Sequence, residues 1–190
     1  MDPLQQFLDW YSGAEEAVLR APNAMALATA SADGAPSVRM VLLKAAEDDG
    51  FVFFTGYLSR KAAELEANPR AALLFYWDAL GRQVRVEGTV ERLSADESDA
   101  YFATRPRGAQ LAASASRQSA VLGSRDELDA RIAELDQQFA GREVPRPQHW
   151  GGYRLAPDAY EFWQHRDDRA HDRLRYRRDG DAWVAEQLWP

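Results

Sequence analysis

The chain has 190 residues, of which 46% are hydrophobic and 11% aromatic, so it is long enough for one folded domain with a substantial buried core. It contains no cysteine, which excludes disulfides, iron–sulfur clusters, thiolate metal sites and a cysteine nucleophile. The net charge of −7 and the lack of an apolar run of about 20 residues lead us to expect a cytoplasmic protein with no nucleic-acid or membrane partner.

The first half of the chain is predicted to form a helix followed by antiparallel strands. Apolar residues from Leu4 to Leu19 follow helical spacing, which predicts an amphipathic helix within residues 1–20. Short apolar runs separated by Asp-Gly turns are typical of a β-meander, and they occupy residues 24–30, 37–44 and 51–55. Helical composition and then strand patterns follow at 59–68, 71–77 and 83–90.

The second half is predicted to add two helices and more strands. Capping-box patterns that begin at Ser94 and Ser124 predict helices over 95–104 and 125–140. Further β segments are expected at 153–155, 160–163, 173–178 and 183–188. About eight strands with interspersed helices favour a mainly β, α+β fold: a single antiparallel β-barrel domain on which helix 125–140 packs.

The two lysines are candidates for anion binding, because they are the only lysines among 23 basic residues and each lies beside an apolar run. A lysine is a compact point charge, although chance surface placement is the alternative explanation. Lys61 follows Ser59 and Arg60 at a predicted helix start, where free amides and the helix dipole favour a phosphate. Arg39 and Lys44 are five positions apart and so lie on opposite faces of a strand, which predicts two different anions or two ends of one site.

Other candidates are more ambiguous. Gln83 either faces water or reads the edge of a heterocycle. Residues 164–178 hold six arginines against three aspartates, together with His165 and His171, which suits a small anion or a solvated segment with balanced ion pairs. The histidines lack metal-ligand spacing, and the chain has no glycine-rich phosphate loop and no Ser-His-Asp arrangement, so we expect no metal.

Seven motifs, in order, resemble the pyridoxine/pyridoxamine 5′-phosphate oxidase family: RMVLLK (39–44), SRKA (59–62), RQVRVEG (82–88), YFATRPRGAQ (101–110), SRQS (116–119), WGGYR (150–154) and EFWQHRDDRAHDRLRY (161–176). The resemblance covers nearly all the chain after the first helix. It implies that residues 1–190 form one FMN-binding split β-barrel domain, which dimerises with itself and binds two flavins at the subunit interface.

The resemblance also implies roles for individual residues. Cofactor residues would be Arg39, Met40, Val41 and Leu42 along the flavin, Arg60 and Lys61 on its phosphate with Thr55 nearby, Gln83 at the ring edge, Gln118 and Ser119 from the other subunit, and Trp163 and Arg173. Substrate-binding residues would be Lys44, Tyr101 and Arg105 around the substrate phosphate. Arg169 and His171 would lie over the pyridine ring as the catalytic pair.

The implied enzyme is pyridoxal 5′-phosphate synthase, a flavoprotein oxidoreductase of vitamin B6 biosynthesis and salvage. It oxidises pyridoxine and pyridoxamine 5′-phosphates to pyridoxal 5′-phosphate, with O2 as electron acceptor and H2O2 released. The alternatives are a related flavin oxidase of another flat reduced ring, such as a phenazine precursor, or a non-catalytic flavin- or B6-binding protein.

Three departures from the family pattern concern the substrate side of the site. Ala109 stands where the family commonly has serine, which removes a hydroxyl donor to the substrate phosphate. Ala170 is a smaller residue than usual between Arg169 and His171. The family's Arg- and Tyr-bearing segment ahead of the first helix has no counterpart before Met1-Asp2-Pro3.

Overall fold

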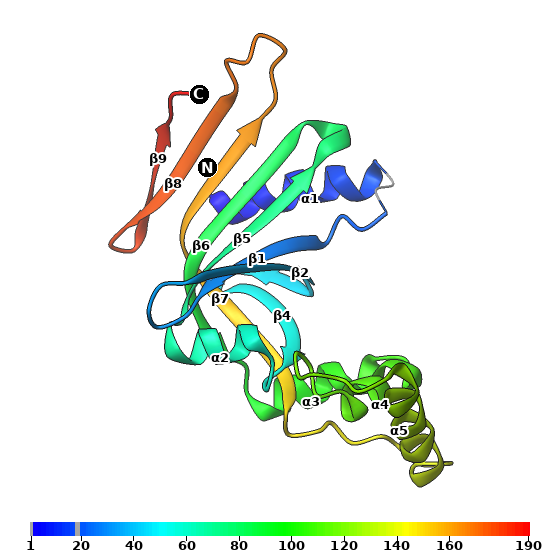
Figure 1. The fold of residues 1–190 in the computed structure, drawn as a ribbon. Coiled ribbons are helices and arrows are strands. Elements are labelled where there is room, and N and C mark those ends of the chain that lie inside the picture. The colour runs from blue at the N-terminus through cyan, green and yellow to red at the C-terminus, as the bar shows by residue number, and fades with distance from the viewer. Residues whose placement is uncertain (1, 18–19) are drawn as a thin grey trace.

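The computed structural model describes residues 2–17 and 20–190, which form one curled antiparallel sheet with helices along its faces and at one end (Figure 1). Its strands are β1 (Ala24–Ala30), β2 (Pro36–Leu42), β3 (Ala45–Glu47), β4 (Gly50–Gly56), β5 (Arg70–Trp77), β6 (Arg82–Arg92), β7 (Trp150–Gln164), β8 (Asp172–Asp179) and β9 (Ala182–Gln187). Its helices are α1 (Pro3–Glu16), α2 (Arg60–Ala67), α3 (Ala95–Thr104), α4 (Arg107–Ala115) and α5 (Arg125–Gln138), with a 3-10 turn, η1, at Asp78–Leu80. The result is an antiparallel half-barrel, as the strand pattern predicts.

Strand β7 has three partner strands. It lies between β6 and β4 in the sheet order β2-β1-β5-β6-β7-β4-β3, and it also pairs with β8. It pairs with β6 through residues 153–164, with β4 through its first six residues and with β8 through its last six. The register of β6 and β7 shifts between Glu87 and Gly88, where a Cβ on Gly88 would lie 2.0 Å from the carbonyl oxygen of Ala156. Only glycine allows this close approach at the bulge, next to the point where β7 changes partners.

Helix α1 closes the core on one face of the sheet. Asp2 caps the helix by accepting a hydrogen bond from the Leu4 amide (3.2 Å), and Pro3 occupies the first helical turn, where its missing N–H costs nothing. Phe7 is fully buried, and its ring lies 4.9 Å from those of both Phe51 and Phe75. This aromatic packing fixes the helix on β4 and β5.

A second, smaller core lies at the end of the sheet where β7 begins. Its buried members are Phe102, Leu111, Val144 and Trp150, and Ile132 and Leu135 of α5 pack against them. Helix α5 makes its main contacts with α4, on the side away from the sheet (Figure 1). The predicted helix 125–140 is thus packed at this end of the sheet, through α4 and the smaller core to which Trp150 of β7 belongs.

Several predicted boundaries also differ. Helix α1 ends at Glu16, and the predicted helical positions Val18 and Leu19 lie outside the described residues. The two segments predicted at 153–155 and 160–163 are one strand, β7, and α4 was not predicted. No helix among the described residues is long and apolar enough to cross a membrane.

Candidate functional site

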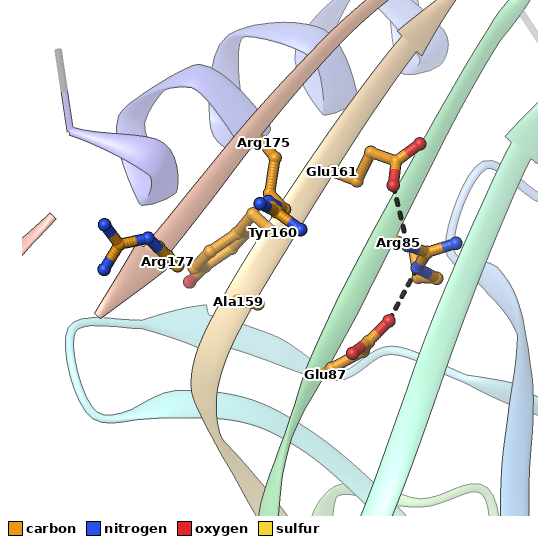
Figure 2. A pocket seen from close by; sticks show the side chains of 7 residues that line it. All are labelled: Arg85, Glu87, Ala159, Tyr160, Glu161, Arg175 and Arg177. Carbon is orange, nitrogen blue, oxygen red and sulfur yellow. Dashed lines mark hydrogen bonds and ion pairs between the residues drawn. The ribbon is translucent and has the colours of Figure 1, made fainter. Parts of the chain in front are cut away.

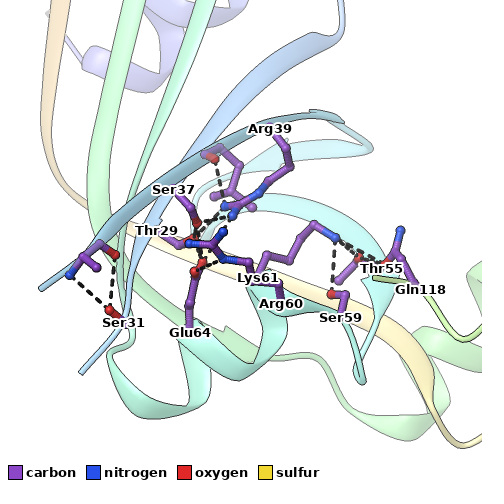
Figure 3. A network of polar contacts seen from close by, with 12 residues as sticks. Thr29, Ser31, Ser37, Arg39, Thr55, Ser59, Arg60, Lys61, Glu64 and Gln118 are labelled. Atoms are coloured by element: carbon purple, nitrogen blue, oxygen red, sulfur yellow. Dashed lines mark hydrogen bonds and ion pairs between the residues drawn. The ribbon is translucent and has the colours of Figure 1, made fainter. Parts of the chain in front are cut away.

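The first cluster of predicted site residues lies at the start of α2 (Figure 3). Ser59 is the residue before the helix and Lys61 its second residue, as predicted from the sequence. The Lys61 side chain is only 7% exposed, and its ammonium donates hydrogen bonds to Thr55 Oγ1 (3.0 Å), Ser59 Oγ (3.2 Å) and Gln118 Oε1 (3.2 Å). All three partners are neutral oxygens, so the Lys61 ammonium is stabilised by dipoles and makes no hydrogen bond to a carboxylate among the described residues.

Burial, together with the nearby positive charge of Arg39, lowers the pKa of Lys61 to about 8, while Glu64 acts in the opposite direction. A buried cation whose charged form is disfavoured gains from a bound anion that restores the missing counter-charge. The donor set at this cluster therefore fits a phosphate group.

Arg39 points into the same cluster but is engaged with the protein. Its Nη1 donates to the Leu27 carbonyl (3.1 Å) and Thr29 Oγ1 (2.5 Å). Its Nη2 donates to Ser37 Oγ and to Glu64 Oε2 (3.2 Å). The guanidinium thus holds the β1–β2 hairpin against α2, which single-sequence reasoning did not predict.

Neighbouring residues of β2 alternate between the two faces of the strand. Val41 is buried on the same face as Arg39, whereas Val38, Met40 and Leu42 are 69%, 63% and 46% exposed. The four residues expected along the flavin therefore do not present their side chains to one side. The exposed apolar residues lie on a strand at the end of the sheet, which is a surface suited to protein contact.

A second cluster lies beside the smaller core. The Lys44 ammonium is 5.8 Å from the centre of the Tyr101 ring, and the Arg105 guanidinium lies 4.5 Å from that of Trp150. Arg105 Nη1 is buried without a hydrogen-bond partner among the described residues, and burial lowers the pKa of this guanidinium. The structure thus brings Lys44, Tyr101 and Arg105 together, as the resemblance implies, with an unsatisfied donor among them.

The two clusters meet at β4, where Thr55 belongs to the first and the preceding Phe54 to the second. Consecutive strand residues point to opposite faces, so the clusters lie on opposite sides of this strand. Arg39 and Lys44 belong to different groups, although the predicted strand 37–44 ends at Leu42 and Lys44 lies between β2 and β3. Phe54 and Trp150, which stack on this site with ring centres 5.4 Å apart, were missed because buried aromatics in a strand pattern indicate only core.

A third group lies at the far end of the sheet. Gln83, Trp163 and Arg173 are direct neighbours across β6, β7 and β8, so their side chains share one face. The His171 ring lies 4.5 Å from that of Trp163, and its Nδ1 accepts a hydrogen bond from the Arg166 amide (3.1 Å). The non-glycine residues with positive φ in the described part of the chain are Ser119 and Arg169, both predicted site residues.

This third group and the first two lie at opposite ends of the molecule (Figure 1). Trp150 and Trp163 lie near the two ends of the 15-residue strand β7. At 3.2–3.4 Å per residue, a straight strand would place them roughly 40 Å apart. One chain therefore does not bring all the predicted site residues together. Gln118, expected from the other subunit, instead contacts Lys61 and Thr55 of its own chain.

A separate hollow of about 190 Å³ on β6, β7 and β8 contains several arginines (Figure 2). Arg85 pairs with Glu87 and with the buried Glu161, and Arg175 and Arg177 both pair with Glu186. Arg166 also pairs with Asp172, and Arg173 with Glu161, so four of the six arginines in segment 164–178 have a carboxylate partner, which agrees with a solvated segment of balanced ion pairs. Among the described residues no group of three or more His, Cys, Asp or Glu is arranged to hold a metal ion.

Comparison with protein-family models gives two matches that together span most of the chain. Residues 12–139 match the model described as pyridoxamine 5′-phosphate oxidase. Residues 150–190 match the pyridoxine 5′-phosphate oxidase C-terminal dimerisation region.

Individual relatives agree with these models. A pyridoxine/pyridoxamine 5′-phosphate oxidase of Rubrobacter xylanophilus is 60% identical over 189 residues, covering 100% of this chain and 87% of the relative. The crystal structure of PhzG from Burkholderia lata in complex with tetrahydrophenazine-1-carboxylic acid is 39% identical with a TM-score of 0.95, covering 100% of this chain and 93% of that one. A pyridoxamine 5′-phosphate oxidase-related, FMN-binding protein of Nostoc punctiforme shares the fold, with a TM-score of 0.78 at 16% identity and coverage of 100% and 99%.

Proposed function

Because the chain belongs to the pyridoxine/pyridoxamine 5′-phosphate oxidase family, we propose that its two cationic clusters bind two different phosphates. The cluster at the start of α2 takes the phosphate of FMN, and the cluster of Lys44, Tyr101 and Arg105 takes the phosphate of the substrate. The observation that carries this assignment is the buried Lys61 ammonium, which has only neutral hydrogen-bond partners.

The activity itself follows from the close full-length relatives. The enzyme oxidises pyridoxine 5′-phosphate or pyridoxamine 5′-phosphate to pyridoxal 5′-phosphate. When bound, FMN would supply the two-electron chemistry of this oxidation, in which C4′ of the substrate is oxidised and O2 is reduced to H2O2. With the amine substrate, water then replaces the nitrogen and ammonia leaves.

On the cofactor side, Lys61 and Arg60 would bind the FMN phosphate, and Thr55 and Gln118 would orient the Lys61 ammonium. Arg39 holds the strand along which the flavin lies, through its hydrogen bonds to the β1–β2 hairpin. Gln83, Trp163 and Arg173 share one face across three strands, which supports their assignment to the flavin ring. Ser119, with its positive φ, would present backbone or hydroxyl donors next to Gln118.

On the substrate side, Arg105 offers a buried donor without a partner, which supports its role toward a phosphate oxygen. Lys44 adds a second charge, and Tyr101 can add a hydroxyl donor. Ala109 contributes no hydroxyl in this chain, so the substrate phosphate would be bound by Lys44, Tyr101, Arg105 and water.

Arg169 and His171 would hold the pyridine ring. Because His171 Nδ1 accepts a hydrogen bond from the Arg166 amide, the neutral imidazole carries its proton on Nε2. His171 would therefore donate a hydrogen bond from Nε2 to the 4′ substituent or the ring hydroxyl. This role orients C4′ before its oxidation.

The enzyme is a homodimer, since its C-terminal 41 residues match the family's dimerisation region. Two further observations support a site shared between subunits: the separation of the third group from the other two, and the exposed apolar residues of β2. We also propose the cytoplasm as its compartment, because phosphate esters are charged and are retained where they are made. Fractionation of cells with an antibody against the chain tests this.

The experiment that tests the residue roles compares the purified yellow protein with its His171→Ala variant. We expect the wild type to form pyridoxal 5′-phosphate and H2O2 from pyridoxine 5′-phosphate. The variant should keep its FMN and lose about 100-fold or more in kcat/KM, the lower end of what one proton-transferring group contributes. Wild-type kinetics in the variant would contradict the proposed substrate site.

The likeness to PhzG keeps a second candidate substrate open, a reduced phenazine precursor. The ring in that complex carries a carboxylate but no phosphate, so it offers Lys44 and Arg105 fewer oxygens and less negative charge, which favours the B6 phosphates. Assaying both substrate classes separates the candidates, because a faster reaction with the phenazine precursor would reverse this order. A protein that binds FMN but turns over neither substrate would be the non-catalytic alternative.

A further inference from the structure

Glu64 is a buried carboxylate to which the roles above assign nothing. Its side chain is 6% exposed and lies between α2 and the β1–β2 hairpin (Figure 3). Glu64 Oε2 accepts hydrogen bonds from Thr29 Oγ1 (2.5 Å), Ser37 Oγ (2.5 Å) and Arg39 Nη2 (3.2 Å), and Oε1 accepts one from Arg60 Nε (2.8 Å). One side chain thus joins α2, which carries Lys61, to both strands of the β1–β2 hairpin.

We propose that Glu64 is a positioning residue for the FMN phosphate. It fixes the first turn of α2, which carries Lys61, against β2, which carries Arg39 and the residues along the flavin. The inference rests on the proposed function of this cluster and adds a residue that would not touch the cofactor itself.

The charges of the cluster agree with this role. Arg39, Arg60 and Lys61 carry three positive charges and Glu64 one negative charge, which leaves a net charge of +2. A phosphate monoester carries about −1.5 to −2 at neutral pH, so the loaded site is close to neutral. The hydroxyl and guanidinium donors hold the pKa of Glu64 at about 2, so the carboxylate stays ionised at neutral pH.

Two effects of removing this charge oppose each other. Electrostatics alone predicts that Glu64→Gln binds a phosphate more tightly, because the net positive charge rises. Positioning predicts weaker binding, because an amide accepts hydrogen bonds only through its oxygen. Its NH2 group would face either Arg60 or the donors of Thr29, Ser37 and Arg39, and the hydrogen bonds on that side would be lost. Since every contact of Glu64 is a donor, we expect the second effect to dominate.

The test measures the dissociation constants of the apoprotein for FMN and for riboflavin, which lacks the phosphate, by quenching of flavin fluorescence. In Glu64→Gln we expect the affinity for FMN to fall about 10-fold and that for riboflavin to change less than about 2-fold. Glu66→Gln is the matched control. It makes the same charge change two residues later, where the side chain is 52% exposed and pairs with Arg92, and it should leave both constants unchanged.

Unchanged or tighter FMN binding in Glu64→Gln would overturn the proposal, and so would equal losses for FMN and riboflavin, which indicate general damage. If Glu64→Gln does not fold, Ser37→Ala removes one neutral hydrogen bond to the same carboxylate. It should weaken FMN alone by about 3-fold, and an unchanged FMN constant would overturn the proposal. A wild type that binds FMN no better than riboflavin would instead contradict the phosphate site itself.

Discussion

At the scale of single residues, the two lysines differ in what surrounds them. Lys44 is exposed beside Tyr101, whereas Lys61 is buried among neutral oxygens. From their sequence positions alone, both were expected to be anion ligands. Burial lowers the pKa of Lys61 to about 8, so the charge of this ammonium changes close to neutral pH.

FMN binding should therefore weaken with rising pH in a way that depends on Lys61. Its pKa of about 8 in the free protein means that the ammonium is charged below pH 8 and becomes neutral above it, while the FMN phosphate is already ionised above pH 7. We expect the dissociation constant to rise by up to about 10-fold between pH 8 and 9. Fluorescence titrations across pH 6.5–9 measure this change.

The control for this pH dependence is Lys61→Arg, because a guanidinium stays charged throughout the range. Its FMN constant should be nearly independent of pH between 7 and 9, even if its affinity is lower. A wild-type profile that is flat from pH 7 to 9 would show that Lys61 is not the phosphate ligand.

Residue patterns also limited what could be predicted of the site. Ser59, Arg60 and Lys61 were found because they combine a helix start with clustered cations. Glu64 was missed, since in a helix sequence it is indistinguishable from the exposed Glu66 two positions later. Only the packing of α2 on the β1–β2 hairpin buries Glu64 and surrounds its carboxylate with hydrogen-bond donors.

At the scale of elements, the strands with strict alternation were predictable and the exceptions have physical causes. Strand β7 was predicted as two pieces because Ala156-Pro157-Asp158 interrupts its apolar pattern, yet pairing with β6 continues past the bulge at Gly88. Helix α4 was missed because Pro106 and Gly108 at its start are typical of loops. Pro106 instead precedes the first helical turn, where a missing N–H is tolerated.

The bulge yields a stability prediction. Gly88→Ala would place a Cβ 2.0 Å from the backbone oxygen of Ala156, and a backbone atom cannot move away cheaply. We expect a loss of about 2 kcal/mol or more and a fall in Tm of roughly 5 °C. Gly108→Ala is the control, because nothing lies within 4 Å of its added Cβ in α4, and it should be neutral or stabilising. Equal Tm values for the two variants would contradict the role of the bulge.

At the scale of the whole molecule, strand β7 decides which residues one chain can bring together. Its beginning supports the Trp150 core beside Lys44 and Arg105, and its end carries Trp163 and leads to His171. The distance between Trp150 and Trp163 follows from the length of β7. The sequence indicates this length only when the segments predicted at 153–155 and 160–163 are recognised as one strand. We propose that a second copy of the chain supplies the missing half of each site, since the C-terminal residues match the family's dimerisation region.

Mixed dimers test this arrangement directly. Lys61→Ala should fail to hold FMN, and His171→Ala should hold it with little turnover, so each homodimer is nearly inactive. If every site combines Lys61 of one subunit with His171 of its partner, a mixed dimer has one site with both changes and one site with neither. Random mixing makes half of the dimers mixed, so about a quarter of wild-type activity should return on co-expression. If both residues served a site within one subunit, every site would carry one change and co-expression would restore nothing.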